Sequence, residues 1–208
     1  MSRELSKAKI KQAERRNMMS SFFVTLLIGL AYEQMASPVR ESISVSGITF
    51  GTFALVATFF VVSIRFFVGN QLHLLSESLT KIPGLAWLYD LIVIILQSTL
   101  LVFIGGDTTI KQNQGASIGF AGLLIALYVI DVLWIVSQWA LGKLIPGWKR
   151  AFIPWVWGIL NTALVVCVVF LSIIIKDIYS TTGLAWLLVL NFLAFVVDVI
   201  LVDYYDVI

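Results

Sequence analysis

The sequence contains few charged residues. Only 12% of its 208 residues are Asp, Glu, Lys or Arg, whereas 60% are hydrophobic, and the mean hydropathy is +0.98. Soluble domains usually contain about a quarter charged residues, and a soluble domain of this size needs more polar surface than these residues supply. The composition therefore excludes a soluble enzyme or a soluble nucleic-acid-binding domain and predicts a membrane protein.

Cysteine and histidine each occur once, as Cys167 and His73. A single cysteine cannot form a disulfide within one chain, and one cysteine with one histidine cannot complete a structural zinc site. The sequence also lacks the motifs of phosphate-binding loops, zinc proteases and serine hydrolases. It therefore predicts no cofactor, no metal site and no enzymatic activity.

Long apolar runs, by contrast, are abundant. A helix needs about 20 apolar residues to cross a bilayer. Runs near this length lie at residues 18–35, 48–68, 84–104, 117–141, 152–175 and 183–202. They do not alternate between apolar and polar residues as the strands of a membrane barrel do. The sequence thus predicts an all-α, polytopic bundle of six transmembrane helices that forms one domain over residues 18–203.

Positive charges are unevenly distributed between the two sides of this predicted bundle. If the N-terminus is inside the cell, only Arg40, Lys111 and Lys176 of the 14 Lys and Arg residues lie on outer flanks. Cytoplasmic flanks retain positive charge, so the pattern predicts that both termini are cytoplasmic, including a short C-terminal segment at residues 204–208. We expect the membrane to be a bacterial inner membrane.

The N-terminal tail, residues 1–17, is strongly basic. Arg3, Lys7, Lys11 and Arg15 recur every four residues, so a helical tail would carry them as one positive stripe. Like charges at this spacing repel each other, and anionic lipid headgroups would relieve the repulsion. An acidic cytoplasmic protein is the alternative partner. No aromatic residue lies among the basic ones, so direct nucleic-acid binding is not indicated.

Ionisable side chains also occur inside the predicted spans, where each costs about 2.5 to 3.5 kcal/mol on insertion scales. At about 1.5 Å per residue, Arg65, Asp90, Asp131 and Asp198 fall in one inner layer. Residues seven apart share a helix face. Such stripes join Asp90 to Gln97, Asp131 to Gln138 and Asn191 to Asp198, and Asn161 adds an amide to the fifth predicted helix. We expect these stripes to face the interior, with Arg65 neutralising one aspartate.

Three interpretations of this polar layer remain open. Its members could fix the helix register through an ion pair and amide hydrogen bonds. They could line a polar path for ions, protons or a small solute, because one arginine cannot compensate three aspartates. Some of them could instead form contacts in a homo-oligomer.

Two further residues are candidates for gating or interface roles. Gly69 and Asn70 predict the end of the second helix, followed by a short helix in the inner interface that carries a solvated His73. Histidine titrates near neutral pH, so a pH-sensing role is the alternative. Glu33 lies about three residues from the predicted outer end of the first helix. It would reach the outer interface or form an acidic mouth that attracts cations.

The sequence therefore predicts one of two functions. The first is an ion channel or a small-solute or proton-coupled transporter whose polar path contains the layer described above. The second is a membrane-embedded sensor or effector subunit, for example in stress or phage defence, that acts through a cytoplasmic partner.

Overall fold

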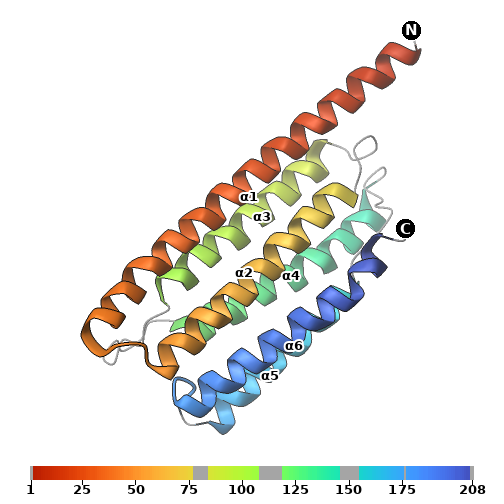
Figure 1. The fold of residues 1–208 in the computed structure, drawn as a ribbon. Helices are drawn as coiled ribbons and strands as arrows, with labels where there is room; N and C mark the ends of the chain where they lie inside the picture. The colour runs from red at the N-terminus through yellow and green to blue at the C-terminus, as the bar shows by residue number, and fades with distance from the viewer. Residues whose placement is uncertain (1, 77–83, 108–118, 146–154, 176, 207–208) are drawn as a thin grey trace.

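The computed structural model describes residues 2–76, 84–107, 119–145, 155–175 and 177–206, and every regular element in these ranges is an α-helix (Figure 1). The helices are α1 (Ser2–Ser46), α2 (Phe50–Ser76), α3 (Gly84–Gly106), α4 (Gly119–Leu144), α5 (Trp155–Ile174) and α6 (Thr181–Asp206). Each contains a stretch that is long and apolar enough to span a membrane. The predicted all-α class with six candidate spans is confirmed.

The six helices run side by side in one bundle. α1 packs along α3, α2 along α6 and α4 along α5, while α3 also contacts α4. Both ends of the chain lie at the same end of the bundle, and the first turns of α1 extend beyond the other helices (Figure 1). An even number of crossings requires this placement of the ends. Which side of a membrane they face remains a prediction.

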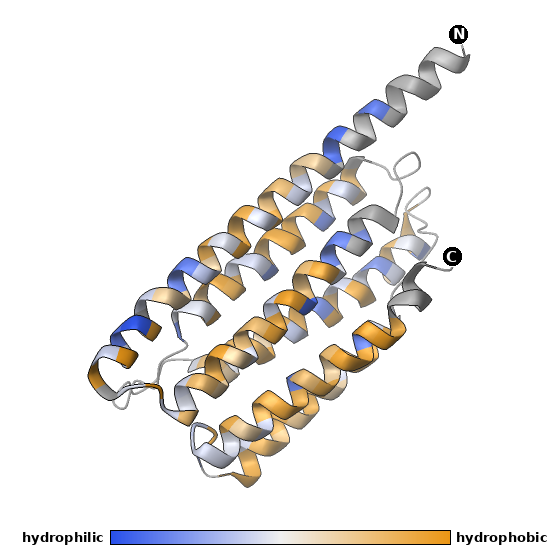
Figure 2. Cartoon of the chain, viewed as in Figure 1, coloured by the Kyte–Doolittle hydropathy of each residue, from blue (hydrophilic) through white to orange (hydrophobic). Residues whose placement is uncertain are grey.

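Large apolar side chains fill the centre of the bundle and also cover its outside. Phe59, Phe66 and Tyr128 are fully buried, whereas Ile159 and Phe170 have exposed fractions of 68% and 60%. Figure 2 shows that hydrophobic residues dominate the length of the bundle. An apolar surface this extensive is unfavourable in water but suits contact with lipid tails. The six helices are therefore compatible with a multi-pass membrane protein.

The first helix is longer than the sequence predicted. We expected it to end before residue 37, but α1 continues to Ser46, and no break separates a tail at residues 1–17 from the span. Contacts with the rest of the bundle explain the extension. Val39 packs against the core, and the Ser42 and Thr52 hydroxyls are hydrogen-bonded at 3.1 Å, which ties the end of α1 to the start of α2.

The predicted end of the second helix at Gly69 and Asn70 is wrong, since α2 continues to Ser76. A side chain at position 69 would collide with the Trp157 ring. Glycine is needed here so that the Trp157 ring of α5 can lie against the α2 backbone, rather than for a helix end. His73 consequently lies within α2 and is buried, not solvated. Most of the predicted interfacial helix falls outside the described residues.

Candidate functional site

The centre of the polar layer is an ion pair between two distant helices. Nε of Arg65 on α2 donates to Oδ2 of Asp198 on α6 at 2.5 Å. The Arg65 side chain is fully buried, and that of Asp198 has an exposed fraction of 17%. Of the three candidate aspartates, Asp198 is therefore the one that takes the single buried guanidinium as its direct partner.

An amide connects this ion pair to Asp131, which is 1% exposed on α4. Nη2 of Arg65 donates to Oδ1 of Asn161 at 3.2 Å, and Nδ2 of Asn161 donates to Oδ2 of Asp131 at 2.5 Å. The orientation of this amide is chemically determined. A guanidinium can only donate hydrogen bonds, so Asn161 must present its oxygen to Arg65 and its nitrogen to Asp131.

The second oxygen of Asp131 accepts a hydrogen bond from another amide. Nε2 of Gln97 on α3 donates to Oδ1 of Asp131 at 2.8 Å, and Oε1 of Gln97 accepts from Nδ2 of Asn70 at 3.3 Å. In both chains of hydrogen bonds, each donor is therefore directed toward the Asp131 carboxylate. We call Asp131, Gln97, Asn161, Arg65 and Asp198 the Asp131 centre.

Asp90 lies in a separate group of polar side chains. Its Oδ1 accepts hydrogen bonds from Nε2 of Gln138 at 2.6 Å and from the Trp134 indole at 3.0 Å. Its Oδ2 lies 3.7 Å from Nε2 of His73. The His73 ring also contacts Trp134 edge-on, with 4.5 Å between ring centroids. We call Asp90, Gln138, Trp134 and His73 the Asp90 centre.

The two centres share one reciprocal pattern. In α3 a glutamine follows an aspartate after seven residues, and α4 repeats this spacing. The helices exchange partners: Asp90 of α3 bonds to Gln138 of α4, and Gln97 of α3 bonds to Asp131 of α4. Because consecutive spans run in opposite directions, the same spacing places each carboxylate opposite the other helix's amide.

Sequence reasoning missed several partners of these residues. Tyr128 is fully buried and donates to Oδ1 of Asn191, and it also lies close enough to Arg65 to interact with it electrostatically. Asn70 and Trp134 were likewise not predicted. The spacing offered a signal for two of them, because Trp134 and Tyr128 each lie three residues from Asp131 on α4.

The remaining candidates do not join either centre. Lys11 and Arg15 are exposed on α1, and the Arg3 and Lys7 side chains lie outside the described residues. Glu33 is also exposed on α1. It lies two residues from Ala31, whose backbone faces Gly105 at the end of α3. The roles assigned to these residues remain predictions.

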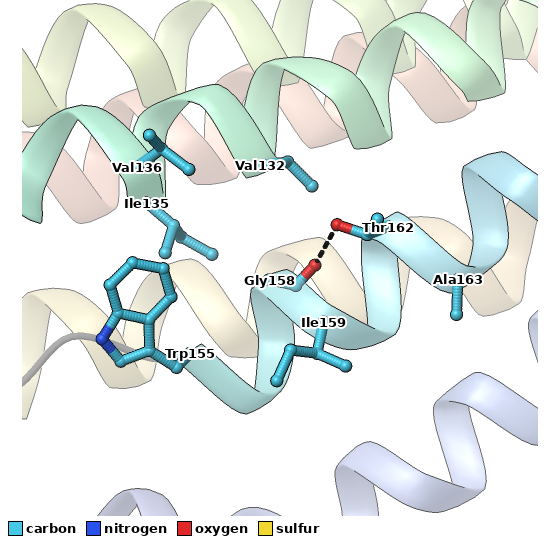
Figure 3. A pocket seen from close by; sticks show the side chains of 8 residues that line it. All are labelled: Val132, Ile135, Val136, Trp155, Gly158, Ile159, Thr162 and Ala163. Atoms are coloured by element: carbon cyan, nitrogen blue, oxygen red, sulfur yellow. Dashed lines mark hydrogen bonds between the residues drawn. The ribbon is translucent and has the colours of Figure 1, made fainter.

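An apolar pocket of about 370 Å³ lies between α4 and α5 (Figure 3). Val132, Ile135 and Ile159 line it, and its one hydroxyl, Thr162 Oγ1, already donates to the Gly158 carbonyl at 2.7 Å. The pocket thus presents mainly hydrocarbon, and the indole of Trp155 also lines it. It suits a lipid chain and is separate from the polar centres.

Among the described residues, no group of three or more His, Cys, Asp or Glu side chains is placed to hold a metal ion. The two centres offer hydrogen-bonding side chains, and their carboxylates and one imidazole can exchange protons. No family model, curated protein or solved structure matches the chain.

Proposed function

We propose that this protein transports protons, or a small solute coupled to protons, across the membrane. The observation that carries the proposal is Asp131, a carboxylate that is 1% exposed within a membrane-spanning helix and bonded by two neutral amides. A purely structural residue in this position would be cheaper as an amide or an apolar side chain. An ionisable group inside a span is by default a functional candidate.

The hydrogen bonds around Asp131 favour a gated carrier over a permanently open channel. Both carboxylate oxygens are occupied by Gln97 and Asn161, and those amides are held in turn by Asn70 and Arg65. A wide aqueous pore would hydrate these groups individually. Their mutual bonding supports a closed state in which the polar path is sealed by its own side chains.

Proton uptake at Asp131 would disturb this arrangement in a defined way. A protonated carboxyl must donate one hydrogen bond, so one of its two amide partners would have to turn its oxygen inward. If Asn161 turned, its nitrogen would face Arg65, which also only donates. A turn of Asn161 on protonation of Asp131 would therefore release it from Arg65 and separate α5 from the α2–α6 ion pair, whereas Gln97 could turn without this effect because Asn70 can both donate and accept. This coupling is how a proton would open the sealed path.

The helix arrangement supports this coupling. α2 and α5 have no close backbone approach in the described part of the chain, so the side chains between them carry the connection. Arg65 and Asn161 form one such link, and the Trp157 ring packed against Gly69 forms the other. Loss of the polar link would leave a hinge of apolar contact between the two helices.

Proton flux into proteoliposomes would test the proposal. Purified protein is reconstituted with a trapped pH-sensitive dye, and a pH gradient with a potassium diffusion potential is imposed. The measurement is repeated after adding the soluble fraction of the source cells, which supplies substrates and partners. We expect flux above that of protein-free vesicles, and we expect Asp131→Asn to abolish it.

Ser137→Ala is the matched control. Ser137 lies on the same helix and donates to the Trp134 carbonyl at 2.7 Å, outside the Asp131 centre. The Ser137→Ala variant should retain normal proton flux. Vesicles that stay tight to protons under every condition, or flux that Asp131→Asn leaves unchanged, would contradict the proposal.

A second candidate function rests on α1. Lys11 and Arg15 are exposed on this helix, and its first turns extend past the bundle (Figure 1), which fits a sensor or effector that binds an acidic cytoplasmic protein or anionic headgroups through its N-terminal segment. In that case, charge-neutral substitutions at Arg3, Lys7, Lys11 and Arg15 should abolish partner binding while proton flux is absent throughout. A homo-oligomer fits both functions, and cross-linking in native membranes would test it.

A further inference from the structure

Two atoms of the Asp131 centre have no hydrogen-bond partner among the described residues. They are Nη1 of Arg65 and Oδ1 of Asp198, and both atoms are buried. They belong to the same ion pair, which uses only Nε of the arginine and Oδ2 of the aspartate. One of them is a donor and the other an acceptor.

Neither atom can remain without a partner at low free-energy cost. Lipid tails offer no hydrogen bonds, and a buried charged group left without one is strongly destabilising. Arg65 cannot lose its proton to relieve the cost. Tyr128 interacts with the Arg65 guanidinium electrostatically and through a side-chain hydrogen bond, but it has no donor left for Oδ1 of Asp198, because its hydroxyl proton is donated to Asn191. The pair therefore needs a partner from outside the chain.

The chemistry of the two atoms defines that partner. It must accept a hydrogen bond from Arg65 and donate one to Asp198, and water does both within one small molecule. Arg65 is sealed by protein, whereas the Asp198 side chain is 17% exposed. Water would therefore reach the pair from the Asp198 side, near the end of α6 where the chain terminates (Figure 1).

We propose that water binds between Nη1 of Arg65 and Oδ1 of Asp198 and connects the Asp131 centre to the aqueous phase. Among the described residues, these are the two polar side-chain atoms of the centre that have no hydrogen-bond partner, whereas both oxygens of Asp131 and both polar atoms of Gln97 have at least one. Asp198 is then the carboxylate that exchanges protons with water. A change in the charge of Asp198 would alter its ion pair with Arg65, and the hydrogen bonds from Arg65 to Asn161 and from Asn161 to Asp131 would carry this structural effect to Asp131. This use of the site rests on the proposed transport function, whereas the hydration itself does not.

Water-edited solid-state NMR would test the site in the unmodified protein in lipid bilayers. The chain is labelled with ¹⁵N-arginine and ¹³C-aspartate. Dephasing of the arginine nitrogens by aspartate carbons identifies Arg65, which forms the one Arg–Asp ion pair among the described residues. We expect magnetisation to pass from water to the Arg65 guanidinium. A guanidinium that receives none would overturn the water site.

Two internal references calibrate the measurement. Exposed Arg15 should receive water magnetisation strongly. With ¹⁵N-glutamine labelling, the Gln97 amide should receive almost none, because its nitrogen and oxygen already have protein partners. If Arg65 receives as little water magnetisation as Gln97, rather than an amount closer to that of Arg15, the site contains no water and the inference is wrong.

The outcome is separable from that of the transport assay on the same preparation. Proton flux with a dry Arg65 would overturn the water site and leave the proposed function standing. A hydrated Arg65 in vesicles that never conduct protons would support the site and contradict the proposed function.

Discussion

The Asp131 centre and the Asp90 centre are built from the same pair of residue types at the same spacing, yet their surroundings differ. Asp131 is held by two amides, one of which leads to Arg65. Asp90 is held by an amide and an indole, and its other oxygen faces His73. One carboxylate is thus coupled to a permanent cation and the other to an imidazole, which is a cation only when it is protonated.

This difference comes from helices distant in the sequence. The stripes on α3 and α4 place each carboxylate opposite an amide, but α5 and α6 contribute Asn161 and Asp198 only to the Asp131 centre. The shared Asp–Gln spacing of α3 and α4 therefore gives both centres the same carboxylate–amide pair. The helices packed around each pair determine which further groups the carboxylate meets. Substitutions in the Asp131 centre and in the Asp90 centre should therefore have different effects.

The largest effect is expected from Asp198→Leu, which leaves the buried Arg65 without its ion-pair partner. Breaking such a pair from one side costs about 3 to 5 kcal/mol of unfolding free energy. Reversible unfolding in mixed micelles would measure it. The double variant Arg65→Met with Asp198→Leu should recover most of the loss, and simple addition of the two single losses would show that the pair is not coupled. No single substitution in the Asp90 centre should reach this magnitude.

A smaller loss is expected from Asp131→Leu, which leaves the Gln97 and Asn161 nitrogens without their acceptor. Each buried donor left in this way costs about 1 to 3 kcal/mol. Asp90→Leu should cost less, because loss of Asp131 also disturbs Asn161 next to the buried Arg65, whereas His73 keeps its ring contact with Trp134 when Asp90 is lost. The same unfolding assay compares the two variants. Equal losses would remove the distinction between the centres.

A pH-dependent change in tryptophan fluorescence should belong to the Asp90 centre alone. His73 is the one histidine of the chain and contacts the Trp134 ring, so protonation of the imidazole as the pH is lowered should quench part of the tryptophan fluorescence. His73→Gln should remove this change, and Trp134→Phe should do the same. Asp131→Asn should preserve it. Quenching that survives both His73→Gln and Trp134→Phe would assign the response elsewhere.

The smallest effect is expected at Tyr179, which belongs to neither centre. Its hydroxyl accepts from the Ala121 backbone N–H at 3.4 Å, and burial raises its pKa. The neutral phenol is then favoured in the folded state, so this stabilisation is present below about pH 10 and is lost as pH rises through the raised pKa. Tyr179→Phe should cost about 0.5 kcal/mol at neutral pH. Unfolding measured from pH 8 to 11 should show a shallower decline for this variant, with flux and fluorescence quenching unchanged.

Much of the fold was predictable because a bilayer restricts what a chain can do. Apolar runs of sufficient length must be helices there, and the structure has six helices of this kind. The heptad spacing of Asp90 with Gln97 and of Asp131 with Gln138 likewise placed these residues on buried faces. Spacing within one helix identifies a face, and it carries no information about which helix will cover that face.

The rest depended on packing between distant segments. Gly69 could equally end a helix or allow close approach, and the Trp157 ring decides for close approach. That choice extends α2 and carries His73 from the predicted interface into contact with Asp90 and Trp134. The partnership of Arg65 with Asp198 similarly requires α2 to lie against α6, which no local pattern encodes.

The separation of the ion pair along the chain also affects how the protein is made. A ribosome synthesises Arg65 96 residues before Asn161 and 133 residues before Asp198. During that interval α2 carries an unmatched cation that costs about 2.5 to 3.5 kcal/mol on insertion scales. The newly made α2 is therefore expected to remain beside the insertion machinery until α6 emerges, so the last helix completes the membrane insertion of the second.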